Sequence, residues 1–267
     1  MRLSDAEARL AAAGIEEARS EARLIFSVLE RIPDYKLLFD PESDSEEIER
    51  AISQRCLRTP LAYILGEVEF YRETYKVSPD CLIPRPETEL LVDYAVSNIP
   101  EGARFADICT GSGCIAVSTL KNTQKTSAVA IDLSPLAIAI ASENAERNGV
   151  SDRIEFITGD ALCGIDGEFF AILSNPPYVS EEAYSALEPE IYAEPKMAFV
   201  GGRDGGDFYR TMIPLYKNNL AKDGFIAFEI GYDQGDLLRR LAAENGMSSE
   251  IIKDYSGLDR IAILKNE

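Results

Sequence analysis

The sequence predicts an α/β protein with a doubly wound, mostly parallel sheet, preceded by a small bundle of helices. From Pro100 onward, short apolar runs alternate with helical stretches, as in parallel sheets whose strands are joined by helices. The first 66 residues lack such runs and repeat their apolar residues at helical spacing. The chain has 267 residues, 46% of them hydrophobic, which is enough for one large domain or for a large domain plus a small one.

The N-terminal segment is predicted to be helical throughout. Apolar residues recur at helical spacing over 3–13, where Ser4 is the expected N-cap, and again over 22–29. Pro33 ends the second helix. A turn rich in Asp and Ser then starts another helix over about 46–57. These short helices predict a small bundle.

A β-hairpin is predicted between the bundle and the sheet. Two runs of aromatic and β-branched residues flank Arg72-Glu73. Three prolines then impose an extended segment before a helix over about 88–98. We therefore divide the chain into a helical domain (1–66), a hairpin linker (67–82) and a sheet domain (83–267).

Six apolar runs are predicted to form the strands of the sheet. They are 105–109, 128–131, 154–157, 169–173, 225–230 and 261–264. Ligands of such sheets bind beyond the carboxyl ends of the strands. Residues that directly follow these runs are therefore the first candidates for a functional site.

Charge and composition exclude several classes of function. Lys and Arg number 27 against 46 Asp and Glu, a formal net charge of −19, so a broad basic face for nucleic acid is not expected. Histidine is absent, which excludes a Ser-His-Asp or Cys-His nucleophile system and any metal site built from histidine. We expect no metal in the site.

The cysteines and the hydropathy pattern predict a cytoplasmic protein. Five cysteines without a C-x-x-C pair indicate reduced thiols and no disulfide framework. No apolar run approaches the ~18 residues that a membrane span needs, so no membrane association is expected.

A glycine-containing turn follows the first predicted strand and opens a helix. In Asp107-Ile108-Cys109-Thr110-Gly111-Ser112-Gly113, the two glycines let the backbone approach a ligand. Asp132 ends the next strand, 19 residues after Gly113, where a carboxylate can accept hydrogen bonds from both ribose hydroxyls. The pattern predicts a nucleoside site. Because Cys109 stands at the first glycine position of G-x-G-x-x-G, a dinucleotide oxidoreductase is disfavoured; a tight turn without a ligand is the alternative.

The loop Ser174-Asn175-Pro176-Pro177-Tyr178 directly follows the buried run 169–173. Two successive prolines fix the backbone and remove two N–H donors, so the loop offers carbonyl acceptors and an amide side chain at the ligand edge of the sheet. Such a site suits a planar NH2 group. The alternative is a proline turn that only closes the strand.

This combination resembles the class I S-adenosylmethionine-dependent methyltransferases, which have a Rossmann-like fold. In them an acidic, glycine-containing turn binds the cofactor and an N-P-P-Y loop receives a planar nitrogen. Five segments in order further resemble the bacterial release-factor glutamine N5-methyltransferases, the PrmC/HemK family. They are 60–66, 82–89, 175–178, 201–205 and 229–235. The match extends from about Pro60 to Arg260.

The resemblance implies a cofactor, a substrate and a set of site residues. The cofactor is S-adenosylmethionine, with S-adenosylhomocysteine as product, and the substrate is a class 1 peptide-chain release factor that the N-terminal helices bind. The cofactor-binding residues are Asp107, Cys109, Thr110, Gly111, Ser112, Gly113, Asp132, Asp160, Ala161 and Asn175. The catalytic residues are Asn175, Pro176 and Tyr178, and the substrate-binding residues are Asn175, Pro176, Pro177, Tyr178, Arg85 and Glu87.

The clearest departure from the family pattern is Cys109, which stands where glycine is usual, and Cys114 stands where a small residue is common. A positive φ at Cys109 is strained for a residue with a Cβ. We therefore expect either a negative φ at this position or a reshaped cofactor turn.

The expected mechanism is positioning and electrostatics. If the Asn175 side-chain oxygen and the Pro176 carbonyl accept the two N–H bonds of a substrate amide, its nitrogen lone pair is directed at the methyl group to be transferred. Tyr178 then packs on the aliphatic part of the substrate, or else forms a surface lid with its hydroxyl in water. The resemblance also implies that the segment Pro84-Arg85-Pro86-Glu87-Thr88 helps to cover the cofactor and substrate site. The alternative is that Arg85 and Glu87 only pair with each other at the start of a helix.

Three functions compete. The first is methylation of the glutamine in the Gly-Gly-Gln motif of class 1 release factors by a monomer that binds no nucleic acid. The second is methylation of an exocyclic amine of adenine (N6) or guanine (N2), which the net charge disfavours. The third, a cofactor-binding regulator, has no need of the Asn175 loop. Glu181, Glu182, Glu188 and Glu190 are expected to form a solvated face or to meet a basic patch on a protein partner.

Overall fold

The computed structural model describes residues 1–267, the side chain of Asp34 excepted. The chain forms two compact units. The first comprises Met1–Val68 and Glu188–Ala193, and the second comprises Glu69–Leu187 and Glu194–Glu267. Within the described residues, no helix is both long and apolar enough to cross a membrane.

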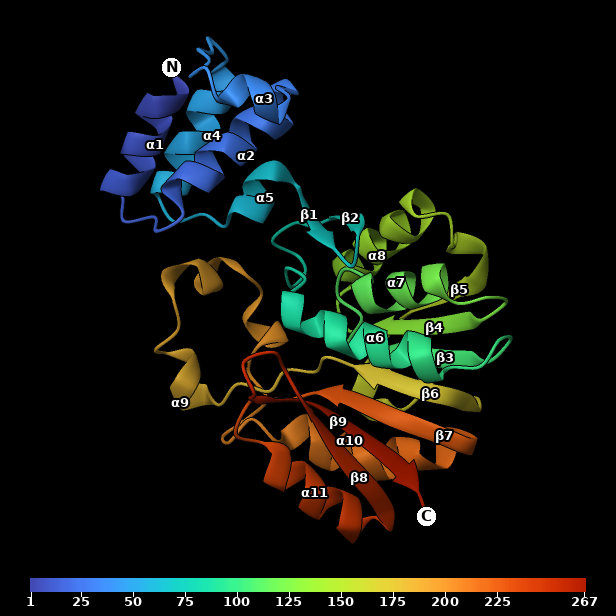
Figure 1. Cartoon of the computed structure of the whole chain (residues 1–267). Coiled ribbons are helices and arrows are strands. Elements are labelled where there is room, and N and C mark those ends of the chain that lie inside the picture. The colour runs from blue at the N-terminus through green and yellow to red at the C-terminus, as the bar shows by residue number, and fades with distance from the viewer. The chain divides into compact units, whose positions relative to one another are not determined.

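The N-terminal part of the first unit is a bundle of helices, blue to cyan in Figure 1. They are α1 (Leu3–Ala12), α2 (Ala18–Glu30), α3 (Asp34–Leu37), α4 (Glu46–Cys56) and α5 (Leu61–Leu65). The predicted apolar faces of the long helices form one core that includes Leu10, Phe26 and Ile52. Ser45 caps α4 by accepting from the Glu47 N–H at 3.2 Å.

The expected N-cap at Ser4 is wrong, because α1 already begins at Leu3. The Ser4 N–H and hydroxyl instead donate to the Asp40 carboxylate at 2.7 and 2.9 Å. Asp40 is 36 residues away along the chain, so no local capping pattern could reveal this partner.

The predicted hairpin is present as β1 (Glu67–Phe70) and β2 (Glu73–Lys76). Its turn lies one residue earlier than predicted, at Tyr71-Arg72, and Glu73 already belongs to the second strand. Both turn residues have positive φ, 49° and 69°. Two positive φ values match the right-handed twist of the strands that such a tight turn joins.

The second unit is built on a seven-stranded sheet in the order β5-β4-β3-β6-β7-β9-β8 (Figure 1). The first five in this order are parallel, while β9 runs antiparallel to β7 and β8 antiparallel to β9. The strands are β3 (Arg104–Ile108), β4 (Ser127–Asp132), β5 (Ile154–Thr158), β6 (Phe169–Ser174), β7 (Leu220–Glu229), β8 (Met247–Lys253) and β9 (Asp259–Asn266). The prediction of a doubly wound, mostly parallel sheet is confirmed.

All six predicted runs are strands, but β8 was not predicted. Only Met247 is buried in this edge strand, and the next three residues, Ser248 to Glu250, are exposed. A strand with so little apolar surface carries no hydrophobic pattern that sequence analysis can detect.

Helices cover both faces of the sheet, as Figure 1 shows. α6 (Glu89–Asn98), α7 (Cys114–Asn122) and α8 (Pro135–Arg147) lie side by side on one face. α10 (Asp207–Tyr216) and α11 (Gly235–Glu244) pack together on the other, and the short α9 (Glu181–Tyr184) lies in the connection after β6. The sheet core between them includes Phe105, Phe169 and Phe228, all fully buried.

Candidate active site

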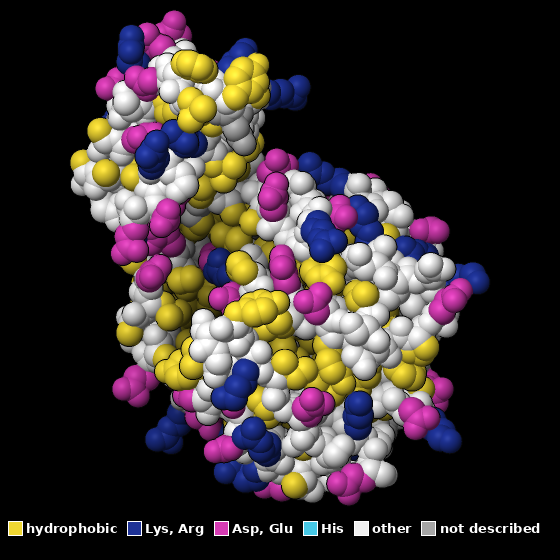
Figure 2. Space-filling model, in the orientation of Figure 1, with side chains coloured by type: hydrophobic (Ala, Val, Ile, Leu, Met, Phe, Trp, Pro, Cys, Tyr) yellow, Lys and Arg dark blue, Asp and Glu magenta, His cyan; other side chains and the backbone are white. Residues whose placement is uncertain are grey.

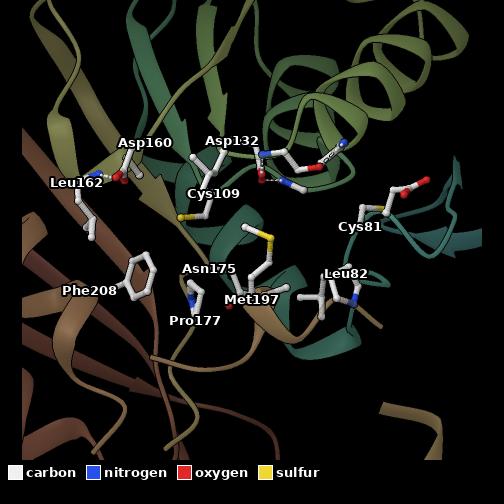
Figure 3. A pocket seen from close by; sticks show the side chains of 18 residues that line it. Cys81, Leu82, Cys109, Asp132, Asp160, Leu162, Asn175, Pro177, Met197 and Phe208 are labelled. Atoms are coloured by element: carbon white, nitrogen blue, oxygen red, sulfur yellow. Dashed lines mark hydrogen bonds between the residues drawn. The ribbon is translucent and has the colours of Figure 1, made fainter. Parts of the chain in front are cut away.

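A cavity of about 230 Å³ opens where the parallel strands end (Figure 3). Its lining includes residues at or just beyond the ends of four neighbouring strands, among them Cys109 after β3, Asp132 at the end of β4, Asp160 after β5 and Asn175 after β6. The remaining walls are largely apolar and include Leu162, Met197 and Phe208. The parallel topology thus brings together residues that are far apart in sequence.

Asp107 is the fully buried anchor of the turn after β3. Its Oδ2 accepts from the Thr110 hydroxyl at 2.6 Å and from the Ala116 N–H at 3.1 Å. Burial raises the pKa of Asp107 to about 7, although these hydrogen bonds oppose the rise. Its other oxygen, Oδ1, has no hydrogen-bond partner among the described residues. Asp107 therefore shapes the turn from below and lies outside the cavity lining.

Cys109 adopts a φ of +63°, so the expected alternative of a negative φ at this position is wrong. The left-handed region costs a residue with a Cβ about 1–2 kcal/mol. Its side chain lines the cavity, as Figure 3 shows. Burial raises the pKa of the Cys109 thiol well above its usual range, so it stays a neutral thiol rather than a nucleophile.

The two glycines of the turn, Gly111 and Gly113, make different contacts. Gly111 lines the cavity and donates its N–H to Asp132 Oδ2 at 2.8 Å. Gly113 has a φ of +80°, and a Cβ on it would lie 2.9 Å from the Cβ of Ala141 in α8. Gly113 thus lets α7 approach α8, a role that the sequence did not predict, and its approach to a ligand stays a prediction.

Thr110 and Ser112 are buried and line a smaller cavity that adjoins the main one. Ser112 also accepts a hydrogen bond through its carbonyl from Asn144 Nδ2 at 2.9 Å. These residues therefore stabilise the turn and also face a cavity.

Asp132 presents a carboxylate to the cavity at the end of β4. Oδ2 accepts from Gly111, and Oδ1 accepts from the Ser134 N–H at 2.9 Å. Burial raises the pKa of Asp132, and the backbone donors oppose the rise. Each carboxylate oxygen has two lone-pair sites, so capacity remains to accept from two further hydroxyls.

Asp160 and Ala161 follow β5 on the adjoining side of the cavity. The Asp160 side chain caps a single 3₁₀ turn by accepting from the Leu162 N–H at 2.9 Å. The buried Ala161 is held by the Tyr216 hydroxyl, which donates to its carbonyl at 2.6 Å. The polar Asp160 side chain thus lies beside the apolar Leu162 in the lining of the cavity.

The loop after β6 divides between the cavity and the core. Asn175 and Pro177 line the cavity, whereas Pro176 is buried outside the lining. Asn175 Nδ2 donates to the Thr88 hydroxyl at 3.3 Å. The Tyr178 hydroxyl donates to Glu229 Oε1 at 3.1 Å, so the alternative of a surface lid with its hydroxyl in water is wrong.

The segment 201–205 is packed directly on this loop. A Cβ on Gly201 would lie 2.3 Å from the Pro177 carbonyl oxygen, and one on Gly205 would lie 2.1 Å from that of Tyr178. No side chain fits at either point. The glycine-rich segment therefore holds the backbone of the loop after β6 from outside the cavity.

Arg85 does not pair with Glu87. Its guanidinium forms an ion pair with Glu194, whose side chain is almost fully buried and also accepts from the Ile83 N–H at 3.0 Å. Glu87 is exposed. The simple pairing considered for these two residues is wrong, and Glu194 is the partner that sequence analysis missed.

The acidic residues after the loop do not form one solvated face. Glu181, Glu182 and Glu188 are exposed, as expected. Glu190 is instead half-buried in the first unit, where Arg55 Nη1 donates to it at 2.9 Å and Arg58 Nη2 at 3.0 Å. Sequence analysis missed this pairing because its partners lie more than 100 residues apart.

Three further residues that support the site were not predicted: Thr88, Glu229 and Gln234. Each lies in a segment that carries the family resemblance. The resemblance assigned no role to Glu229 or Gln234, and it included Thr88 only as the end of the segment 84–88 that covers the site. All three are buried and bond to the loop after β6 or to each other.

The charges around the cavity restrict the ligand. Three of the described lining residues are carboxylates, Asp80, Asp132 and Asp160, and none is Lys or Arg. Such a lining disfavours a phosphate and suits a nucleoside without phosphates, especially one with a positive charge.

Comparisons with known proteins identify the family to which this chain is similar. The family described as "Methyltransferase small domain" matches residues 86–198, and "PrmC N-terminal domain" matches residues 3–66. A "Release factor glutamine methyltransferase" of Moorella thermoacetica is 35% identical, over 97% of this chain and 95% of that protein. One of Thermodesulfovibrio yellowstonii is 40% identical, over 85% and 84%.

A solved structure supports the fold. The ribosomal protein L11 methylase of Lactobacillus delbrueckii subsp. bulgaricus matches with a TM-score of 0.53 and 23% identity, over 68% of this chain and 80% of that one. With the strand order and the helices on both faces, this likeness establishes the class I methyltransferase fold for the second unit.

Proposed function

The chain belongs to the release factor glutamine methyltransferase family, and from this we propose that it methylates the side-chain amide nitrogen (N5) of a glutamine in a protein. The glutamine is that of the Gly-Gly-Gln motif of bacterial class 1 release factors. The observation that carries the proposal is Asn175, followed by two prolines, at the edge of a nucleoside-sized cavity lined by carboxylates and no cations.

S-adenosylmethionine supplies a transferable methyl group on a positively charged sulfonium and leaves as S-adenosylhomocysteine. The cavity fits this group, because its carboxylates favour a cation and its apolar walls suit an adenine. We propose that Asp132 accepts the ribose hydroxyls and that Asp160, Ala161 and Leu162 border the base. Cys109, Gly111 and Asn175 contact the cofactor from the remaining sides, while Asp107, Thr110, Ser112 and Gly113 shape the turn that holds it.

The chain's own contribution to the chemistry is to orient a poor nucleophile. An amide nitrogen is weakly nucleophilic because its lone pair is delocalised into the carbonyl. Asn175 Oδ1 and the Pro176 carbonyl accept the two N–H bonds of the substrate amide and so direct its lone pair. The Asn175 Nδ2 group already donates to Thr88, which leaves the side-chain oxygen for the substrate. Tyr178 supports the loop through Glu229.

We propose that the N-terminal helical domain, residues 1–66, docks the protein substrate, because the cavity lining contains none of its residues. Arg85 and Glu87 stand on the segment beside the smaller cavity and are proposed to border the substrate path. We further propose a cytoplasmic monomer, in keeping with five free cysteines.

The nucleic-acid alternative has less support. The net charge is −19, and Lys and Arg side chains on the face shown in Figure 2 lie scattered among acidic ones without a continuous basic stripe. An enzyme that binds nucleic acid neutralises several phosphates with Lys and Arg.

The proposal is tested by incubating the protein with methyl-labelled S-adenosylmethionine and one candidate substrate at a time: a class 1 release factor, RNA or DNA. Label in the release factor is expected, and replacing the glutamine of its Gly-Gly-Gln motif by alanine should abolish it. Label in nucleic acid alone would overturn the proposal. A variant that lacks residues 1–66 should keep its cofactor affinity, measured by calorimetry, and lose activity on intact release factor.

A further inference from the structure

Glu229 is a buried carboxylate that bonds to two elements of the proposed site. It ends β7, and only 1% of its surface is exposed. Oε2 accepts from the Thr88 hydroxyl at 2.6 Å, and Oε1 accepts from the Tyr178 hydroxyl at 3.1 Å. Burying a carboxylate is costly unless it is hydrogen-bonded. Here the hydrogen bonds to the start of α6 and to the loop after β6 offset the cost of burying Glu229.

The hydrogen bonds around Thr88 have a fixed direction. Burial raises the pKa of Glu229, and the hydrogen bonds from Thr88 and Tyr178 oppose the rise. The ionised carboxylate can only accept, so in this form it takes the single hydroxyl proton of Thr88. The hydroxyl oxygen then has only lone pairs left, and Asn175 Nδ2 donates to it at 3.3 Å. If the Asn175 amide were turned over, its oxygen would face another acceptor. The Glu229 carboxylate therefore favours one orientation of the Asn175 amide.

Tyr178, at the other end of the loop, is held by hydrogen bonds to Glu229 and to Gln234. Its hydroxyl donates to Glu229, and its carbonyl accepts from Gln234 Nε2 at 3.0 Å. Gln234 Oε1 in turn accepts from the Gly231 N–H at 2.9 Å. The two ends of the Asn-Pro-Pro-Tyr loop are thus held by one buried network.

We propose that Glu229 is a positioning residue for methyl transfer, which acts through Thr88 to keep the carbonyl oxygen of Asn175 toward the substrate amide. The inference rests on the proposed function, in which that oxygen accepts a substrate N–H. In the opposite orientation the Asn175 NH2 group meets the substrate NH2 group, and two donors face each other. Loss of the network should lower turnover and leave cofactor binding nearly unchanged.

The decisive comparison is Thr88→Val against Thr88→Ser. Valine has nearly the shape of threonine without the hydroxyl, whereas serine keeps the hydroxyl. Thr88→Val should lower kcat on release factor about 10- to 100-fold, because small errors of position are costly in a reaction that depends on orientation. Thr88→Ser should stay within about threefold of wild type by the same reasoning. Cofactor affinity, measured by calorimetry, should change little in either variant. Equal turnover in the two variants would overturn the proposal.

The role of Glu229 itself is tested by non-additivity. Glu229→Met removes both acceptors at a similar side-chain length and should lower kcat in the wild-type background. In the Thr88→Val background, the same change should have a much smaller effect, because the route to Asn175 is already broken. Full additivity would overturn the proposed route. If Glu229→Met does not fold, the two Thr88 variants decide the question.

A spectroscopic readout separates this inference from the proposed function. In ¹⁵N spectra the Asn175 side-chain NH2 signal is assigned by its absence in Asn175→Asp. Its protons should exchange with water faster in Thr88→Val than in wild type or Thr88→Ser. Unchanged exchange in Thr88→Val would overturn the link to Asn175, whatever the substrate. If wild type does not methylate release factor, the proposed function fails, while this measurement still tests the network.

Discussion

A Cβ placed on Gly113 would lie 2.9 Å from the Cβ of Ala141 and 3.1 Å from its Cα. This close approach joins the start of α7 to the middle of α8, where the turn after β3 becomes a helix. The turn carries Cys109 and Gly111 into the cavity, so the packing of two helices fixes the position of the proposed cofactor site.

Gly113→Ala should lower the free energy of unfolding by about 2–5 kcal/mol, because overpacking adds to the strain of a positive φ. Gly102→Ala is the matched control, since Gly102 has nearly the same φ of +79° but nothing within 4 Å of its Cβ position. It should lose only about 1–2 kcal/mol. Urea unfolding of both variants measures the difference. Equal losses would show that the contact with Ala141 is unimportant.

Asp132→Ala should weaken S-adenosylmethionine binding about 10- to 100-fold, because hydrogen bonds to a charged acceptor contribute about 1.5–3 kcal/mol. Calorimetry measures the affinity. Asp236→Ala, on the exposed face of α11, is the control and should bind normally. Asp132→Ala also removes the acceptor for Gly111 and Ser134, so its thermal stability should be measured alongside. Normal affinity would mean that Asp132 is only a turn acceptor.

Asn175→Ala should lower turnover on release factor about 10²- to 10³-fold, by analogy with loss of one oxyanion-hole hydrogen bond. From the sequence alone, Asn175→Asp is expected to retain more activity than Asn175→Ala, because it keeps an acceptor oxygen, unless the NH2 donor is also needed. The bond from Asn175 to Thr88 changes this expectation, since a carboxylate cannot donate to that hydroxyl. We therefore expect both variants to be severely impaired with nearly normal cofactor affinity. High turnover of Asn175→Asp would show that the donor is dispensable.

Asp107 should make the stability of the cofactor-free protein fall as the pH rises. Its pKa is raised from 3.8 to about 7 in the folded state, so folding favours the protonated form. This stabilisation is complete below about pH 4 and is lost as the pH rises through about 7, with a slope of up to about 1.4 kcal/mol per pH unit. Asp107→Asn cannot ionise and should lose less stability between pH 5 and 8 in urea unfolding. Parallel profiles for the two proteins would contradict this assignment.

Arg55 is held between Glu21 at 2.5 Å and Glu190 at 2.9 Å, with only 9% of its side chain exposed. Arg55→Met should lower the free energy of unfolding by about 3–5 kcal/mol, because it leaves two partly buried carboxylates without their partner. Arg9→Met is the control, since Arg9 forms an exposed pair with Glu49 at 2.7 Å and should lose at most about 1 kcal/mol. Chemical denaturation measures both variants. Similar losses in the free energy of unfolding would show that the ion pairs of Arg55 contribute no more than an exposed pair.

Local sequence determined most elements of this protein and the loops in which we propose that its chemistry occurs. A buried strand needs a short apolar run, and a turn after it needs glycine or proline. The strands β3 to β7 and the loops that end them can therefore be predicted from the sequence. The edge strand β8 is the exception, because exposed polar residues are sufficient to pair with β9. The same logic locates the Asn175 loop and the turn around Gly111, since each directly follows a buried apolar run.

Only the tertiary structure decided which side chains meet. Thr88 and Glu229 are 141 residues apart, and Arg85 and Glu194 are 109 apart, so neither pair leaves a periodic signal in the chain. The φ of Cys109 and the contact between Gly113 and Ala141 likewise follow from how α7, α8 and the sheet pack. Hydrophobic periodicity depends on which face of an element is buried, whereas a buried hydrogen bond depends on two elements meeting within about 3 Å. The network that orients Asn175 is therefore a property of the fold rather than of any one segment.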